Sequence, residues 1–222
     1  MDGGSVATVR EDGYHHGHLR RALLDAAMEL IRERGIDGFS LREVARRASV
    51  SHAAPYHHFA DRGDLVSALV VESFQRFEAA FREAVERTRG PHLERIRAIG
   101  RAYVRFAFDD PARFTLMWRP ELRTVEDDSP VDEAGLASYQ VLIDEIDEGQ
   151  RAGEIVEGDI GLLSLAAWSA VHGLATLIVD GPLRGQVLAW SQAEPMVDAV
   201  LDLAIRGLAV SPRTRTRPRS SR

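Results

Sequence analysis

The chain contains 222 residues, of which 45% are hydrophobic, and it has no cysteine. This length and apolar content suit one large domain, or a small module fused to a larger one, with a well-packed core. The composition excludes disulfide bonds and thiolate metal sites, and it agrees with a reducing compartment, so we expect a cytoplasmic protein.

Charge is distributed unevenly along the chain, and no lysine occurs. Residues 1–60 hold eight arginines, eight acidic residues and six of the eight histidines, whereas residues 61–212 hold fifteen arginines and twenty-six acidic residues. The last ten residues add five arginines. Because the overall pI is about 5.8, below the value typical of nucleic-acid-binding domains, any DNA contact must depend on local placement of arginines.

The first sixty residues predict three short helices. Residues 1–13 are polar and are expected to form a disordered arm. An apolar stripe at helical spacing then ends at Gly35, a residue type that commonly closes helices. Ser40 and Glu43 have the spacing of a capping box, which predicts the start of a second helix. A turn over residues 49–51 leads to a third short helix through Phe59.

The remainder of the chain predicts further helices and no strand, so we assign an all-α fold. Ser191 and Glu194 have capping-box spacing at the start of the last helix. The acidic residues 124–130 are expected to form a loop, and the arginine-rich residues 211–222 a disordered tail. Apolar periodicity and the proline and glycine breaks predict helices over residues 65–88, 91–108, 113–118, 131–152, 160–179 and 195–208.

The segment 160–179 is long and apolar enough to span a membrane. It contains Ser164, Ser169 and His172, and Asp159 and Asp180 flank it. We therefore interpret this segment as a helix buried on all sides by protein, and we expect no membrane association.

The second and third predicted helices, joined by a short turn, form a helix-turn-helix pattern. In such a motif the third helix presents small and polar side chains to the major groove of DNA, which admits one helix. The alternative is an ordinary helical subdomain with a solvated face. Four residues would face base edges, namely Ser51, His52, Ala53 and Ala54. Three more, Tyr56, His57 and His58, can donate to phosphates or bases.

The motif resembles the DNA-binding signature of the tetracycline-repressor-like (TetR) family over residues 39–51, FSLREVARRASVS, and residues 56–59, YHHF. Residues 14–20, YHHGHLR, are similar to the opening of one subgroup. Residues 168–175, WSAVHGLA, resemble the subgroup named for its Trp-x-x-x-His-Gly segment. The resemblance extends over roughly residues 13–208.

Members of this family are homodimers that bind operator DNA and usually release it when a ligand occupies the C-terminal domain. The resemblance therefore implies a DNA-binding domain over residues 14–60 and an effector-binding and dimerisation domain over residues 61–210. It implies a transcriptional regulator, acting as a repressor on a roughly palindromic operator of double-stranded DNA.

The same resemblance implies individual DNA contacts. Ser40 and Arg42 would meet the phosphate backbone, as would Tyr56 and His58. Arg62 stands where the family usually has lysine, and either side chain can hold a phosphate. Gly63 stands where an acidic residue is commoner, so we expect the following helix to begin less firmly.

Aromatic residues gather at helical spacing in the C-terminal part. Most of them belong to the core of any helical protein, but an apolar ligand cavity would be built between the same helices. We expect a small apolar or amphipathic effector and no cofactor. The candidate lining residues are Phe74, Phe77, Tyr103, Phe106, Met117, Trp168 and His172.

An apolar stripe runs along the last helix from Met196 to Leu208, and the segment 160–179 adds further apolar surface. Together they exceed what one small domain needs to bury. We therefore expect a homodimer whose two-fold interface is formed by the last two helices.

Other functions have less support in the sequence. Histidines 15, 16 and 18 and histidines 52, 57 and 58 suggest metal binding, but no thiolate accompanies them, so we expect no metal. If these imidazoles contact DNA, affinity should fall as pH rises through about 6.5. The chain has no nucleophile elbow, phosphate loop or metal-ligand helix, so we expect no enzyme. A protein-binding helical adaptor remains the alternative, and salt distinguishes it, because DNA contacts through arginines weaken steeply as salt rises.

Overall fold

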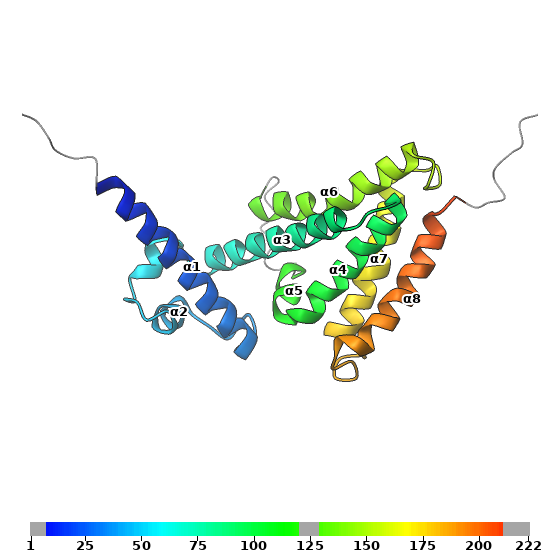
Figure 1. The fold of residues 1–222 in the computed structure, drawn as a ribbon. Helices are drawn as coiled ribbons and strands as arrows, with labels where there is room; N and C mark the ends of the chain where they lie inside the picture. Colours follow the sequence, from blue (N-terminus) through cyan, green and yellow to red (C-terminus); the bar gives the residue numbers. More distant parts are fainter. Residues whose placement is uncertain (1–7, 120–128, 211–222) are drawn as a thin grey trace, which may run out of the picture.

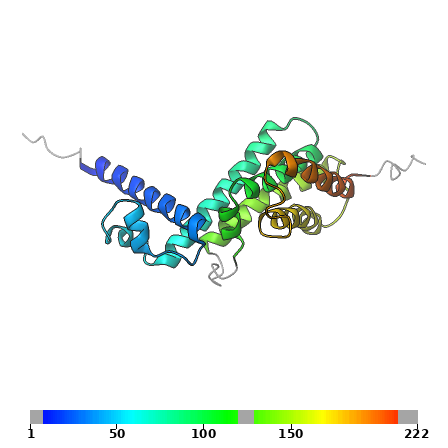
Figure 2. The ribbon, with the colours of Figure 1, turned by 90° about the horizontal axis from the view of Figure 1, so that it is seen from below.

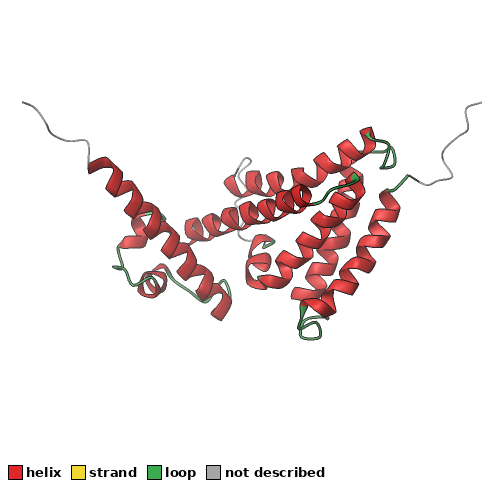
Figure 3. Ribbon diagram, viewed as in Figure 1, coloured by secondary structure: helices red, strands yellow, loops and turns green. Residues whose placement is uncertain are grey.

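The computed structural model of the protein describes residues 8–119 and 129–210, with side chains from residue 18 onward. These ranges contain eight α-helices, one 3-10 helix and no strand, which confirms the all-α prediction (Figure 3). The helices are α1 (Thr8–Arg34), α2 (Leu41–Arg47), η1 (Ala54–His57), α3 (Arg62–Arg87), α4 (His92–Asp109), α5 (Pro111–Met117), α6 (Pro130–Arg151), α7 (Ile160–Val179) and α8 (Trp190–Leu208).

The helices form two units (Figure 1). One unit contains α1, α2 and η1, and α3 runs from it into a bundle with the helices that follow (Figure 1). In the view turned by 90°, the two units again lie on opposite sides of the start of α3 (Figure 2). Within the bundle, α3 packs on α4, α5 and α6, whereas α4 packs on α7 and α8.

Local signals in the first unit confirm two predictions. The Ser40 hydroxyl accepts from the Glu43 backbone N–H (3.3 Å), and the Glu43 carboxylate accepts from the Ser40 backbone N–H (2.9 Å). These reciprocal bonds form the predicted capping box and start α2. Gly35 ends α1 with φ of 77°, a conformation that costs glycine little.

Three boundaries differ from the sequence predictions. Thr8 begins α1, so the backbone is helical within the predicted disordered arm. The third helix of the motif is the 3-10 turn η1, because Pro55 lacks a backbone N–H and disfavours helical angles at the preceding residue. Trp190, not Pro195, begins α8. The Gln192 side chain accepts from the Leu188 and Ala189 N–H groups there. The predicted capping box between Ser191 and Glu194 is therefore wrong.

The start of α3 is firm despite Gly63. The Asp61 carboxylate accepts from the Asp64 backbone N–H (2.9 Å), and the Asp64 carboxylate accepts from the Ala60 N–H (3.0 Å). The expected loosening at Gly63 is therefore wrong. The predicted acidic loop lies almost entirely outside the described residues, as do the predicted tail 211–222 and the first seven residues of the arm.

Helix α7 is the one helix of the described ranges that is long and apolar enough to span a membrane, and 39% of its most apolar stretch is buried. It packs on α4, α6 and α8. The prediction that it is buried on all sides is wrong for a single chain, because Leu162, Leu165 and Leu177 are 68%, 47% and 43% exposed. These leucines leave an apolar stripe facing outward.

The core of the bundle is aromatic. The Phe77 ring lies 4.3 Å from the Phe81 ring and 4.8 Å from the Tyr103 ring, measured between centroids. A second apolar cluster around Ile146 joins α4, α6 and α8 at the far end of the bundle. The sequence therefore builds a rigid bundle and attaches the small N-terminal unit through α3.

Candidate functional site

The surface predicted to meet DNA base edges is only partly exposed. Ser51, His52 and Ala53 are exposed where α2 turns into η1. Ala54 is 8% exposed because it packs into the motif, so its side chain is not available to a base, and we remove it from the candidate surface. Tyr56 is 54% exposed, so its hydroxyl is available to a phosphate or a base.

The residues predicted to meet phosphates divide into two groups. Arg42 is exposed on α2, whereas Ser40 is exposed but uses its hydroxyl to cap the helix. Arg62 is half-buried, donates to the Ile36 carbonyl and lies 4.8 Å above the Phe39 ring. These contacts hold Arg62 within the motif, so its part in phosphate binding would require their release.

Sequence reasoning missed one arginine. Arg46 follows Arg42 by four residues, so the two share one face of α2, and Arg46 is also exposed. Neither residue takes part in the ion pairs found among the described side chains. The spacing of the two arginines could have revealed this basic face beside Ser51 and His52.

Histidines are spread over several environments. His52 and His57 are exposed and His58 is half-buried, whereas the side chains of His15 and His16 lie outside the described ones. A separate group joins His92 of α4 to Glu145 and Glu148 of α6, with all candidate ligand atoms within 4.8 Å of one another. His92 Nδ1 lies 2.8 Å from Glu145, so these two side chains already satisfy each other.

The bundle encloses a cavity of about 500 Å³ between α3, α4, α6, α7 and α8. Four predicted residues line it: Phe74, Phe77, Tyr103 and Trp168. The other three predicted residues are not among its lining. Met117 is 1% exposed in the core, Phe106 packs behind Phe77 with ring centroids 4.9 Å apart, and His172 stands behind Trp168.

The sequence prediction also omitted several lining residues. Phe81 follows Phe77 by one helical turn, so its spacing could have identified it. Trp118 and Tyr139 also line the cavity, together with a face of α6 that includes Asp132. No spacing in the sequence indicates which face of α6 turns inward, because that depends on how α6 packs on α3.

Three polar side chains at or behind the cavity wall bond to one another. The Tyr103 hydroxyl lies 2.7 Å from His172 Nδ1 and accepts from Trp168 Nε1 at 3.3 Å. Burial raises the pKa of Tyr103 far above its usual range and lowers the pKa of His172. We therefore assign a neutral phenol that donates to a neutral imidazole, so this group carries no charge at neutral pH.

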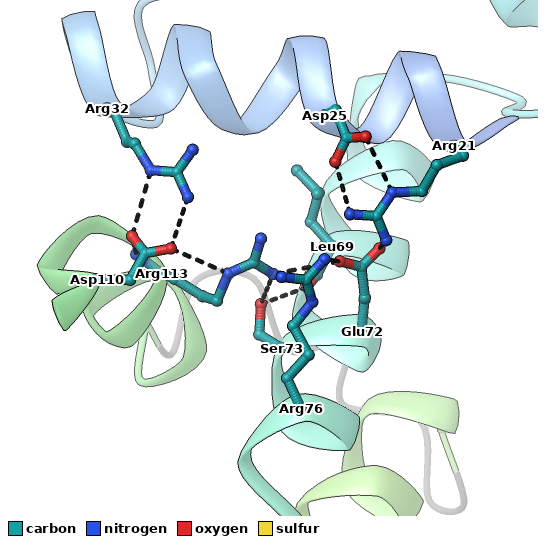
Figure 4. Close-up of polar contacts among 9 residues, drawn as sticks. All are labelled: Arg21, Asp25, Arg32, Leu69, Glu72, Ser73, Arg76, Asp110 and Arg113. Carbon is teal, nitrogen blue, oxygen red and sulfur yellow. Dashed lines mark hydrogen bonds and ion pairs between the residues drawn. The ribbon is translucent and has the colours of Figure 1, made fainter. Parts of the chain in front are cut away.

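A polar network connects α3 and α5 of the bundle with α1 (Figure 4). Arg32 of α1 donates to Asp110 at 2.6 Å, and Asp110 also accepts from Arg113 Nε at 3.2 Å. Arg113 is 4% exposed and donates to the Ser73 hydroxyl of α3 at 3.0 Å. Although burial opposes it, the Arg32 hydrogen bond and charge hold the pKa of Asp110 below its usual value. Figure 4 shows the side chains of α1, α3 and α5 converging on these bonds.

The network reaches the aromatic residues through α5. Phe114, the residue after Arg113, lies with its ring 5.9 Å from the Tyr103 ring and 6.3 Å from the Trp118 ring. A second ion pair, between Arg21 of α1 and Glu72 of α3 at 3.2 Å, lies alongside (Figure 4). The same short helix therefore contacts both the cavity wall and the N-terminal unit.

Two family models match the two units in turn. The model described as "Bacterial regulatory proteins, tetR family" matches residues 23–69, and "Tetracyclin repressor-like, C-terminal domain" matches residues 96–204. Among curated proteins, the HTH-type transcriptional regulator UidR of Escherichia coli (strain K12) is 31% identical over 67 residues. That match covers 30% of this chain and 34% of UidR. The tetracycline repressor protein class D of Escherichia coli is 37% identical over 57 residues, 26% of each chain. The matched stretch therefore spans about a third or less of these relatives.

Solved structures match over nearly the whole chain. A protein of unknown function from Rhodococcus sp. RHA1 is 40% identical with a TM-score of 0.77, over 89% of this chain and 98% of that one. A TetR family transcription regulator from Marinobacter aquaeolei VT8 is 17% identical with a TM-score of 0.68, over 89% and 99%. The transcriptional regulator FadR from Bacillus subtilis, in complex with stearoyl-CoA, is 20% identical with a TM-score of 0.69, over 84% and 98%. The last two likenesses concern the fold alone.

Proposed function

The chain belongs to the tetR family of bacterial regulatory proteins and is a DNA-binding transcriptional regulator, and from this premise we propose a homodimeric repressor that a small lipophilic effector releases from its operator. The observation that carries the proposal is the 500 Å³ aromatic cavity, whose wall is linked to the DNA-binding unit through α5. The protein acts in the cytoplasm and has no catalytic role.

The DNA-binding surface comprises the turn before η1 and the basic face of α2. Ser51, His52 and Ala53 would face the base edges of the major groove. Arg42 and Arg46 would hold phosphates on the flanking backbone. Their exposure and the lack of an acidic partner in the described ion pairs support this assignment.

The homodimer would form through α7 and α8. Leu162 and Leu177 on α7 are 68% and 43% exposed, and Leu203 on α8 is 71% exposed. The buried half of the predicted stripe on α8, including Val197 and Leu201, instead packs within the chain. Large exposed apolar side chains on these two packed helices support a two-fold interface, which would set two motifs on one palindromic operator.

Effector release needs a coupling between cavity and motif. The Phe114 ring contacts the aromatic wall, and the neighbouring Arg113 bonds to Asp110, the partner of Arg32 on α1. A ligand that displaces Tyr103 or Trp118 in the cavity wall would push on the Phe114 ring beside them, shift α5 and thereby change the orientation of α1. By linkage, such a ligand must itself bind the DNA complex more weakly than the free protein.

The experiment that tests this function measures binding of the purified protein to the DNA flanking its own gene, with non-specific competitor, at two salt concentrations. A specific complex that weakens steeply with salt is expected. A protein-binding adaptor would give no specific complex, and selection from random DNA sequences would then also recover no preferred site. Either result separates the regulator from the adaptor.

A further inference from the structure

The cavity has an unusual charge pattern. Seven of its lining residues are aromatic, and Asp132 is the one charged residue among its described lining. No arginine is among the described lining residues, although the chain has 28 basic residues, all of them arginine. A ligand in this cavity would therefore meet aromatic faces and one carboxylate.

Asp132 stands on the inner face of α6. Asp132, Gly135, Leu136 and Tyr139 recur at three- and four-residue spacing, and all four line the cavity. The Ser129 hydroxyl donates to one Asp132 oxygen at 2.7 Å, which holds the side chain at the first turn of the helix. Asp132 is half-buried and has no arginine among the ion pairs of the described residues.

Asp132 lies near the opening of the cavity. Leu136 and Leu165 line the cavity yet are 68% and 47% exposed, so the opening lies between α6 and α7. Asp132 precedes Leu136 by one helical turn on the same face. A ligand whose apolar body fills the aromatic interior would therefore leave its polar end beside this carboxylate.

The other polar side chains at the cavity wall add no charge to that of Asp132. Tyr103, His172 and Trp168 bond to one another, and burial keeps both the phenol and the imidazole neutral. Aromatic faces attract cations, and the attraction grows when the site excludes water. A carboxylate or phosphate on the ligand would meet no cation among the described lining residues and would be repelled by Asp132.

We propose that the effector is a lipophilic organic cation, with an aromatic or alkyl body in the cavity and its positive group beside Asp132. This proposal rests on the proposed function, because it identifies the class of ligand for the same cavity. The proposed ligand is a cation, whereas the FadR structure holds stearoyl-CoA, an anionic ligand.

The test uses two probes of the same shape and opposite charge, tetraphenylphosphonium and tetraphenylborate. Each competes with the neutral fluorescent probe N-phenyl-1-naphthylamine for the purified full-length protein. We expect the phosphonium to displace the reporter at a concentration at least about tenfold lower than the borate needs, since both the carboxylate and the rings favour a cation. Equal displacement, or tighter binding of the borate, would overturn the proposal.

A pair of variants assigns the preference to one residue. Asp132→Asn keeps the acceptor for Ser129 and should weaken phosphonium binding about tenfold without changing reporter binding. Asp144→Asn alters an exposed carboxylate on the same helix, outside the cavity lining, and should change neither. Unchanged phosphonium affinity in Asp132→Asn would refute the role of this residue. Failure of the neutral reporter to bind at all would instead refute the cavity as an effector site.

Discussion

The network between the two units can be tested by removing one charge. Asp110→Asn replaces the carboxylate that joins Arg32 of α1 to Arg113 of α5. Asparagine retains an oxygen that can cap α5 at the Arg113 backbone N–H, so the helix start is kept. The substitution therefore removes the charge and little else.

The expected cost follows from the hydrogen bonds. A bond to an ionised group contributes about 1.5–3 kcal/mol, against about 0.5–1.5 kcal/mol for a neutral pair. Asp110 accepts from two arginine side chains and is 22% exposed, so the loss is about 1 kcal/mol for each arginine, or about 2 kcal/mol in total. Because Arg113 is 4% exposed, water cannot readily replace its lost partner.

Urea unfolding followed by far-ultraviolet circular dichroism measures this loss. The pKa of Asp110 is lowered in the folded state, so its contribution is present above the unfolded value of about 3.9 and disappears as pH falls through the folded value. The wild type and Asp110→Asn should therefore differ at neutral pH and converge in acid. Asp109→Asn, at the neighbouring exposed carboxylate that pairs with Arg105, is the matched control and should cost less than about 0.5 kcal/mol.

Operator binding gives the second readout. If the network couples the two units, Asp110→Asn should still bind the operator but respond less to an effector, as measured by fluorescence anisotropy. The reasoning would be refuted if Asp110→Asn were as stable as the wild type at neutral pH. It would also be refuted if both proteins lost the same unfolding free energy between neutral pH and acid.

Four further predictions concern other parts of the chain. Ser49 has φ of 58° in the turn after α2, so Ser49→Gly should relieve strain and raise stability by about 0.5 kcal/mol in thermal melts. A Cβ at Gly100 would lie 2.3 Å from Leu201, so Gly100→Ala should cost about 1–3 kcal/mol in urea unfolding. Leu177→Glu should convert the dimer to a monomer in light scattering, whereas Leu188→Glu, in the exposed loop before α8, should not. Arg46→Ala should reduce the slope of log affinity against log salt by about 1, and Arg87→Ala, at the far end of α3, should leave it unchanged.

Where a single local signal decides the structure, the sequence predicted it. The Ser40–Glu43 capping box and the Gly35 stop depend only on residues within a few positions, and both are confirmed. The Ser191–Glu194 box has the same spacing but fails, because Gln192 accepts from the preceding backbone N–H groups and starts α8 earlier. Two competing local caps cannot be ranked from spacing alone.

The cavity shows what periodicity leaves open. Phe74 and Phe77 were identified because aromatic residues at helical spacing share a face wherever that face points. Met117 and Phe106 have the same character but lie in the filled core or behind the wall. Which apolar residues border empty space depends on the distance between helices, and glycines such as Gly100 set that distance through contacts with distant segments.

Sequence reasoning also misjudged the start of α3. Gly63 suggested a loose joint at the start of α3, yet the carboxylates of Asp61 and Asp64 cap the backbone on both sides of it. In the proposed coupling, α3 and the motif would move together, so a change in the bundle would act on α1 from another side. The bonds from Arg32 to Asp110, 78 positions apart in the sequence, provide that second point of contact. We propose that two contacts at separate points would let a shift of α5 rotate the N-terminal unit, whereas one flexible joint would absorb the shift.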